Sequence, residues 1–476
     1  MSSTVRNGRR RVGKPEEDGA PVTAPCDVAD EVARLRRTFG SGRTRSLPWR
    51  REQLEGLLRL LDEREPELAA AIEQDLGRNA IGSFMGDIAP VRSEIRHTLK
   101  NLEKWARPRK VRVPVTQQPG VAREIPEPKG TVLVIGAWNF PILLTLHPLV
   151  SAIAAGNTVL LKPSELSPHV AAALATLLPL YLDPSAVAVV TGGVDVSTQV
   201  LAERFDHIFF TGSTRVGQVV LEAAAKHLTP VTLELGGKSP VIVTADADLD
   251  VAARRIAWGK CVNNGQACIA PDYVLVEDSV RPQFVERLLT RLQESAKAEP
   301  TRMVNEAHFD RVVGLLDGHG GDVVGGTHDR ATLKIAGTVV TDPDPDSPVM
   351  QEEIFGPVLP VMSVPSLADA VAFVNDRPKP LALYVFSNSG RSVDTVVSST
   401  SSGSVGVNQV LYQMLVPELP FGGVGESGMG SYHGRKGFDT FSHLKAVLHK
   451  PTVIDLALTY PPYGPIASRI LRRVMG

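Results

Sequence analysis

Cysteine is scarce in this sequence: its 476 residues include three, Cys26, Cys261 and Cys268. This odd, low count excludes a disulfide framework and favours reduced thiols in a cytoplasmic compartment. No pair has Cys-x-x-Cys spacing and no histidines cluster with the cysteines, so we expect no metal site. Each thiol is therefore either a small core residue or a reactive group.

The sequence also lacks a charge imbalance and a long hydrophobic run. Lys and Arg total 51, Asp and Glu total 52, and the formal net charge is -1, whereas nucleic-acid-binding proteins usually carry a basic excess. No stretch approaches the ~18 apolar residues of a membrane-spanning helix. We expect neither a nucleic-acid partner nor a membrane span. Residues 1–26, rich in Arg, Gly, Pro and Ser, are predicted to be a disordered extension rather than a secretory signal.

Apolar stripes at three- and four-residue spacing predict helices in the early chain. One stripe consists of Leu54, Leu57, Leu58 and Leu61, and another of Ile88, Val91, Ile95, Leu99 and Leu102. Short β-rich runs then alternate with Ala- and Leu-rich stretches, at 132–135, 158–161, 187–190 and 207–210. Strand and helix in alternation predict an α/β fold with a doubly wound, Rossmann-like parallel sheet, which binds ligands at the carboxyl ends of its strands.

A second α/β unit is predicted from about residue 234. It has strand-like runs at 240–244 and 273–277 and amphipathic helices from about 248, over 280–297 and over 366–375. Residues 111–126 alternate between apolar and polar and contain Pro-Gly, which predicts a hairpin projecting from the first unit. The expected architecture is two α/β domains with a small additional β element.

Cys268 has the most unusual neighbours of the three thiols, in the string NNGQACIAPDY at 263–273. A thiolate attacks carbonyls strongly when its pKa is lowered and it is accessible. Gly265 lets the backbone approach a ligand closely, and Asn263 and Gln266 can order the turn. Cys268 is a candidate nucleophile, with a small core residue as the alternative.

Glu234 and Asn139 are candidate partners of such a nucleophile. Glu234 ends a strand-like run in TLELGGKSP, where burial would raise its pKa toward that of a general base. Its alternative is a carboxylate that caps the next element. Asn139 follows a strand-like run in GAWNFPILL, so its amide could donate to an oxyanion or cap a helix that opens with Pro141.

Two further strings suggest where a phosphate-bearing cofactor binds. FFTGSTRVG runs from a strand through Gly212 and Ser213 into a helix containing Gly217, and the first N–H groups of such a helix can hold a pyrophosphate. LLKPSE places Lys162 and Glu165 just beyond the second strand, where a ribose hydroxyl is met in doubly wound sheets.

Together these strings resemble the aldehyde dehydrogenase superfamily over about residues 28–450, and closely its class 3 branch of fatty and aromatic aldehyde dehydrogenases. The matching strings occur in the family's order and approximate spacing. They are AWNFP, KPSE, FTGS with the later glycine, LELGGKSP, NxGQxC, EEIFGP and PFGGVGESGMGSYHG.

The resemblance implies a role for each matching position. Cys268 matches the nucleophile, Asn139 with the Cys268 backbone N–H the oxyanion hole, and Glu234 the general base, with Glu353 as a second candidate base. The implied contacts to NAD or NADP are Trp138, Lys162, Glu165, Gly212, Ser213, Gly217, Leu235, Gly236, Glu353 and Phe355. Glu165 should repel a 2′-phosphate and so favour NAD, although the class 3 branch often accepts both.

The implied activity is oxidation of a medium- or long-chain aliphatic or aromatic aldehyde to the carboxylic acid, through a thiohemiacetal and a thioester on Cys268. In a CoA-acylating alternative, CoA rather than water takes the acyl group, and Glu234 would not be needed as a base. A catalytically silent relative that uses the fold for packing is the second alternative. The joint presence of Cys268, Glu234 and Asn139 disfavours it.

The resemblance also implies a domain organisation. A dinucleotide-binding domain is expected at 27–110 and 127–233, a catalytic domain at 234–420, and bridging elements for a homodimer at 111–126 and 421–450. Residues 451–476 form a C-terminal tail. Its last twelve residues carry apolar and Arg side chains that can pack on a partner subunit or lie peripherally on a membrane surface.

Overall fold

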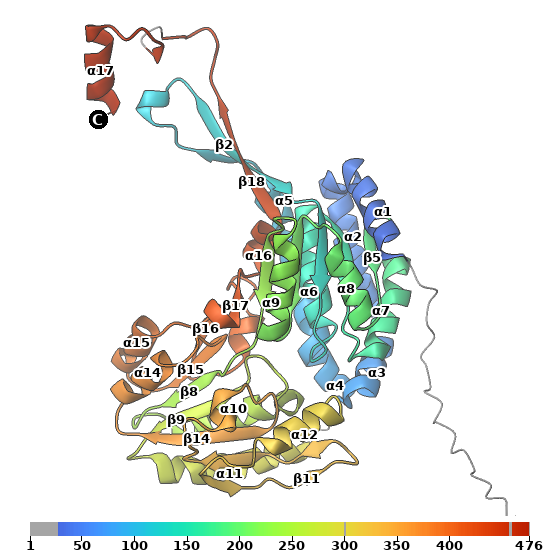
Figure 1. Cartoon of the computed structure of the whole chain (residues 1–476), viewed down its shortest axis with the longest axis vertical. Helices are drawn as coiled ribbons and strands as arrows, with labels where there is room; N and C mark the ends of the chain where they lie inside the picture. Colours follow the sequence, from blue (N-terminus) through green and yellow to red (C-terminus); the bar gives the residue numbers. More distant parts are fainter. Residues whose placement is uncertain (1–26, 299–300, 457–458, 476) are drawn as a thin grey trace, which may run out of the picture.

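The computed structural model describes residues 27–298, 301–456 and 459–475, so the predicted extension at 1–26 lies outside the described residues. Two sheets covered by helices form the body of the molecule, and a small third sheet projects from it (Figure 1). The α/β class predicted from the sequence is confirmed.

The first large sheet has the order β17-β7-β6-β3-β4-β5. Its strands are β3 (Thr131–Ile135), β4 (Thr158–Lys162), β5 (Val187–Val189), β6 (His207–Thr211), β7 (Val231–Glu234) and β17 (Gly428–Met429). All neighbours pair in parallel except β17, which is antiparallel to β7. Because β3, β4 and β6 are buried at every residue, their sequences read as near-continuous apolar runs.

Helices cover both faces of this sheet. They are α1 (Val28–Gly40), α2 (Leu47–Glu63), α3 (Glu65–Leu76), α4 (Ala80–Ser83), α5 (Ala89–Ala106), α6 (Leu143–Ala155), α7 (Pro168–Tyr181), α8 (Val194–Ala202) and α9 (Thr214–Ala225). Successive strand residues point to opposite faces, so Leu133 packs with α1, α8 and α9 while Val132 and Val134 pack with α2, α5, α6 and α7. The apolar stripes predicted for α2 and α5 supply much of the hydrophobic cluster that contains Val132 and Val134.

The second large sheet has the order β10-β13-β14-β9-β8-β15-β16. Its strands are β8 (Pro240–Val243), β9 (Tyr273–Glu277), β10 (Asp322–Val324), β13 (Thr338–Thr341), β14 (Val358–Val364), β15 (Ala382–Phe386) and β16 (Ser404–Val407). Only β10 pairs in the antiparallel sense.

Helices also cover the second sheet on both faces, and small elements fill its connections. The helices are α10 (Leu249–Cys261), α11 (Arg281–Ala298), α12 (Glu306–Gly314), α13 (Pro348–Gln351), α14 (Leu367–Asn375) and α15 (Gly390–Ser399), and a small strand pair is formed by β11 (His328–Asp329) and β12 (Lys334–Ile335). Side chains of α10 and α11 pack with Val241 and Val274, while those of α12, α14 and α15 pack with Ile242 and Leu275. This alternation buries both faces of the sheet.

The small sheet consists of β1 (Arg109–Val111), β2 (Val121–Pro128) and β18 (Ser442–His449), all antiparallel. β1 and β2 form the hairpin predicted around 111–126. The expected bridging range 421–450 is divided: β18 belongs to this sheet, whereas β17 pairs with β7, and α16 (Gly434–Thr440) packs against α5 and α6.

The C-terminal tail ends in α17 (Pro465–Met475), which has no buried residue. Its apolar side chains Ile466, Ile470 and Val474 recur every four residues and are 75%, 43% and 54% exposed. No helix of the described chain has the length and apolarity needed to cross a membrane.

Candidate active site

The loop that carries Cys268 connects α10 to β9 through a tight turn. Asn263, Asn264 and Gly265 have φ values of 53°, 54° and 77°, a left-handed region that Asn and Gly adopt most readily. A Cβ on Gly265 would lie 2.3 Å from the main-chain oxygen of Gly356. The close approach predicted at Gly265 is therefore to the main chain at Gly356, a residue of the same domain.

The Cys268 thiol lies beside two carboxyl groups. Burial raises the pKa of this thiol, and the charges of Glu353 and Glu234 raise it further, to about 12, against the opposing effect of the Cys268 and Ile269 backbone N–H groups. Both carboxyl charges therefore act on the sulfur through the buried interior. The structure therefore brings together three residues that are far apart in the sequence.

Cys268 also lines a cavity of about 290 Å³. Most of the cavity wall is hydrophobic, and its apolar residues include Ile81, Met85, Phe140, Leu143, Leu144, Trp258, Val262, Ile269, Leu411, Met414, Leu415 and Phe421. An apolar pocket with a few polar groups is typical of a small-molecule site.

Glu234 is the last residue of β7 and is 3% exposed. Neither of its carboxyl oxygens has a hydrogen-bond partner among the described residues, which contradicts the alternative that this carboxylate caps the next element. Burial raises the pKa of Glu234 well above its usual value. A buried, unpartnered carboxyl group costs free energy, so its position next to Cys268 calls for a functional explanation.

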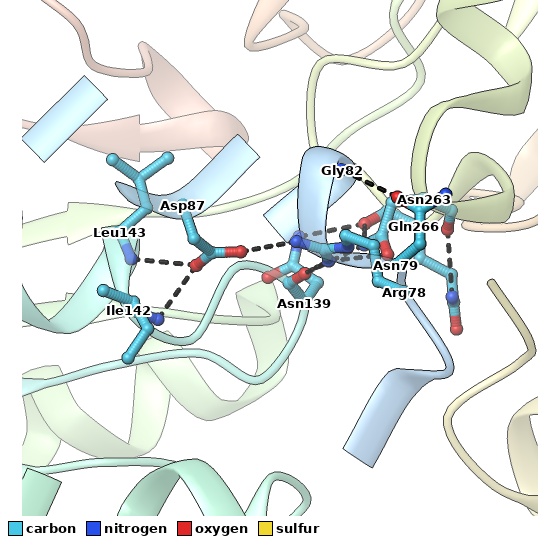
Figure 2. Close-up of polar contacts among 9 residues, drawn as sticks. All are labelled: Arg78, Asn79, Gly82, Asp87, Asn139, Ile142, Leu143, Asn263 and Gln266. Carbon is cyan, nitrogen blue, oxygen red and sulfur yellow. Dashed lines mark hydrogen bonds and ion pairs between the residues drawn. The ribbon is translucent and has the colours of Figure 1, made fainter. Parts of the chain in front are cut away.

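Asn139 lies between β3 and α6, and its side chain faces the Cys268 loop (Figure 2). Its Nδ2 donates to the main-chain oxygen of Gln266 at 3.1 Å, and the second hydrogen of an amide nitrogen remains available for a ligand. The helix-cap alternative is wrong. α6 begins at Leu143 rather than at Pro141, and Asp87 Oδ1 accepts from the Ile142 and Leu143 N–H groups at 2.9 and 3.0 Å.

Glu353 lies on a loop that polar contacts hold in place. Lys238 Nζ donates to the main-chain oxygens of Val349 and Glu352 at 2.9 and 2.8 Å, and the Ile354 N–H donates to Asp272 at 3.2 Å. Burial and the charge of Asp272 raise the pKa of Glu353 to about 8.

The Glu353 carboxyl group packs on Gly236, and two aromatic residues of the predicted cofactor set contact each other. A Cβ on Gly236 would lie 2.0 Å from Glu353 Oε2, while Oε1 is buried without a partner in the described chain. Trp138 and Phe355 contact each other edge to face, with ring centroids 5.4 Å apart. Sequence positions that the resemblance linked to the cofactor thus lie together here.

The remaining predicted cofactor residues lie at the carboxyl ends of β4 and β6. Lys162 Nζ and Glu165 Oε2 form a 2.6 Å ion pair. Burial alone would raise the pKa of Glu165. The hydrogen bond from Lys162, the Glu165 backbone N–H and the charge of Lys162 together outweigh burial, so the pKa is lowered. After β6, Gly212 leads into α9, whose N-cap Ser213 accepts from the Val216 N–H.

Gly217 in α9 packs against Leu235, because a Cβ there would lie 2.8 Å from Leu235 Cδ2. This glycine brings the helix close to the chain that follows β7. The helix N-terminus can hold a pyrophosphate, and Lys162, Glu165 and the unpartnered Glu353 Oε1 can meet ribose hydroxyls. These residues fit a dinucleotide lying across the sheet ends.

Two residues at the site were not identified from the sequence, Arg78 and Asp87. Arg78 donates to the Asn139 main-chain oxygen and to Asn263 Oδ1, and it forms an ion pair with Asp87 (Figure 2). The local sequence offers one feature that could have pointed to them: Asp87 lies next to the apolar stripe of α5. An aspartate at such a position is only weak evidence of a functional site.

Known proteins are similar to this chain in sequence and in fold. A model of the aldehyde dehydrogenase family matches residues 20–447. The chain is 51% identical over 444 residues to the rat (Rattus norvegicus) "Aldehyde dehydrogenase, dimeric NADP-preferring", covering 91% of this chain and 98% of that protein. It is 50% identical over 440 residues to the rat "Aldehyde dehydrogenase family 3 member A2", covering 91% of each.

A solved structure agrees with these sequence matches. It is the substrate-bound state of Staphylococcus aureus AldH, which has a TM-score of 0.91 and 38% identity over 94% of this chain and 99% of that chain. The chain belongs to the aldehyde dehydrogenase family, in its class 3 branch, and is an NAD(P)-dependent oxidoreductase of aldehydes.

Proposed function

We propose that this protein oxidises medium- and long-chain aliphatic or aromatic aldehydes to carboxylic acids, with Cys268 as the nucleophile. One observation carries the proposal: the Cys268 thiol lies on the wall of an apolar cavity and is under the electrostatic influence of the buried carboxyl groups of Glu353 and Glu234. The first property gives an apolar aldehyde a place to bind, and the second supplies groups that can accept protons near the sulfur.

The first half of the reaction uses Cys268 and Asn139. The thiol must lose its proton before it attacks the aldehyde carbon, because the thiolate is the nucleophile. The resulting oxyanion is stabilised by the second Asn139 amide hydrogen and the Cys268 backbone N–H, and one such donor typically contributes on the order of 3 kcal/mol. When bound, NAD or NADP supplies the oxidant that takes the hydride from the former aldehyde carbon.

The second half of the reaction removes the acyl group from Cys268. Water attacks the thioester carbon, its proton passes to a carboxylate, and the C–S bond breaks to release the acid and the thiolate. We assign the proton acceptor to Glu234, whose buried oxygens have no other partner among the described residues. Glu353 is the second candidate, although its contact with Gly236 favours a role in cofactor binding.

A series of aldehydes of increasing length tests the substrate assignment. Each methylene buried in the apolar cavity is expected to contribute ~0.8 kcal/mol, or about fourfold in kcat/KM, until the cavity is filled. The measurement is NAD(P)H absorbance with linear aldehydes from propanal to decanal and with benzaldehyde. Equal turnover of short polar semialdehydes would contradict the assignment.

The CoA-acylating alternative is tested by product analysis. With saturating aldehyde and cofactor, we expect the free acid in equal yield with and without added CoA, since Glu234 is the proposed base that activates water. Formation of acyl-CoA, detected by mass spectrometry, would overturn the hydrolytic assignment.

Glu165 is expected to set the preference between NAD and NADP. Its ionised carboxylate repels a 2′-phosphate, but its ion pair with Lys162 and its 41% exposure weaken that repulsion. We expect Glu165→Gln to shift the ratio of kcat/KM values toward NADP by about fivefold. Glu52→Gln, an equal charge change at an exposed position of α2, is the control and should leave the ratio unchanged. An unchanged ratio in Glu165→Gln would refute the role of this carboxylate.

We also propose that the protein is a homodimer formed through the small sheet. Supporting this, β18 exposes Leu444 and Leu448 at 41% and 53%, and a relative is named as dimeric. In this proposal the apolar stripe of α17 packs on the partner subunit. Sedimentation equilibrium should give twice the 51.1 kDa chain mass, and a monomer would contradict the proposal.

We propose that the reaction takes place in a reducing, cytoplasmic compartment, an assignment supported by the odd, low cysteine count of the sequence. Cell fractionation with activity measurements tests it. Activity confined to an oxidising compartment would contradict it.

A further inference from the structure

A buried guanidinium, that of Arg78, connects the two domains and also lines the cavity that Cys268 borders. Arg78 follows α3 and its left-handed C-cap Gly77, and it is 3% exposed. It donates to the main-chain oxygen of Asn139 in the first domain and to Asn263 Oδ1, at 2.7 Å, in the nucleophile loop of the second (Figure 2). The planar fork of an arginine can hold several acceptors in fixed relative positions, which a lysine cannot.

Asp87 holds this guanidinium in place. Its Oδ2 pairs with Arg78 Nη1, while its Oδ1 accepts from the Ile142 and Leu143 N–H groups at the start of α6. Asp87 lies in a five-residue π-helix, Phe84–Ile88, between α4 and α5. Such a wide turn re-aims side chains and is frequent at functional sites. The Asp87 carboxylate thereby ties Arg78 to the turn that carries Asn139.

The same network continues to the residues next to Cys268. Asn263 Nδ2 donates to the main-chain oxygens of Asn139 and Gln266, at 2.9 and 3.0 Å, and Asn139 Nδ2 donates to the Gln266 oxygen at 3.1 Å. Gln266 precedes Cys268 by two residues. Moving the Arg78 guanidinium would therefore move the Asn139 amide relative to the sulfur.

We propose that Arg78, held by Asp87, is a positioning residue that aims the Asn139 amide at the substrate oxygen. The inference rests on the proposed function, in which Asn139 stabilises the oxyanion. It adds that the oxyanion site is assembled across the domain boundary by a residue that bonds the main chain of Asn139 and the side chain of Asn263. A buried ion pair is by itself weak evidence for stability, whereas a fixed geometry is what transition-state stabilisation requires.

The test is a double-mutant cycle between Arg78 and Asn139. Arg78→Met and Arg78→Lys should each lower kcat by about 10²-fold, the loss typical of one missing oxyanion donor, while KM for the cofactor stays unchanged. In an Asn139→Ala background, Arg78→Met should cause no further loss of kcat, because the amide it aims is absent. Asp87→Asn should act in the same direction if the Arg78→Met protein does not fold.

A buried arginine elsewhere provides the matched control. Arg50 is 7% exposed and donates to the main-chain oxygens of Thr44, Arg45 and Ala154. Arg50→Met should lower Tm without lowering the kcat of the folded enzyme, as expected of a purely structural arginine.

The outcomes separate this inference from the function on which it rests. A slow Asn139→Ala enzyme together with fast Arg78→Met and Arg78→Lys enzymes would overturn the positioning role alone. Equal losses from Arg78→Met with and without Asn139 would also overturn it, because the effects would then be independent. An Asn139→Ala enzyme as fast as the wild type would instead refute the proposed oxyanion site.

Discussion

Replacing Cys268 by alanine is expected to abolish aldehyde-dependent NAD(P)H formation. No other thiol of the described chain borders the cavity: Cys261, near the end of α10, is buried, with its sulfur 3.8 Å from the main-chain oxygen of Leu292. Without the thiol, the aldehyde cannot form the covalent adduct from which the hydride leaves. We therefore expect a fall of at least about 10³-fold in kcat. Steady-state NAD(P)H absorbance at saturating substrate measures it.

Control measurements on two variants and a labelling experiment test whether the loss of activity comes from the Cys268 sulfur. Cys261→Ala should keep nearly full activity, and Cys268→Ala should keep the wild-type Tm and cofactor affinity. Iodoacetamide should inactivate the wild type in proportion to labelling at Cys268. Because burial and the charges of Glu353 and Glu234 raise the pKa of this thiol, the labelling rate should climb as pH rises from 7 to 10. Substantial activity in Cys268→Ala would disprove the nucleophile assignment.

The strands of the first sheet were predictable because burial leaves a simple pattern. β3, β4 and β6 are covered by helices on both faces, so their residues are almost all apolar. β17 left no such pattern. It is two residues long and joins β7 by main-chain pairing of Gly428 with Glu234, and main-chain pairing constrains side chains little. This is why the predicted bridging range 421–450 includes residues that the structure assigns to the first sheet.

At the site, local chemistry gave candidates but could not decide between alternatives. The sequence around Glu234 and Asn139 fitted caps as well as catalytic groups. The Asp87 contacts at the start of α6 exclude the cap at Asn139, and the lack of a hydrogen-bond partner for the Glu234 carboxyl oxygens among the described residues excludes the cap at Glu234. Arg78 could not be found from the sequence at all. Its partners Asn139 and Asn263 lie 61 and 185 positions away, and an isolated arginine after a helix usually faces solvent.

Glu234→Gln is expected to separate the two halves of the reaction. Glutamine has nearly the shape of glutamic acid but cannot take a proton from water, so hydrolysis of the thioester should slow by about 10²- to 10⁴-fold. Acylation of Cys268 does not require that water. Rapid mixing should therefore still give a burst of one NAD(P)H per subunit, followed by a much slower steady state, and mass spectrometry should find the acyl group on Cys268.

The pH dependence of the steady-state rate provides a second test of Glu234 as the base. Burial raises the pKa of Glu234, and a base acts only after losing its proton, so the wild-type steady-state rate should fall as pH drops through that raised pKa. Glu234→Gln should lose this dependence. Glu94→Gln is the matched control, because burial also raises the pKa of Glu94, to about 7, away from the cavity wall. Glu94→Gln should keep the wild-type NAD(P)H burst and the wild-type steady-state rate.

Glu353→Gln decides between the two candidate bases. If Glu353 holds the cofactor, its loss should raise KM for NAD(P) and weaken the burst itself, leaving little acyl-enzyme to accumulate. A full burst with a slow steady state in Glu353→Gln, combined with normal turnover in Glu234→Gln, would transfer the role of base to Glu353. Both carboxyl groups raise the pKa of the same thiol, so the step that each substitution slows, rather than the size of the loss, identifies the proton acceptor.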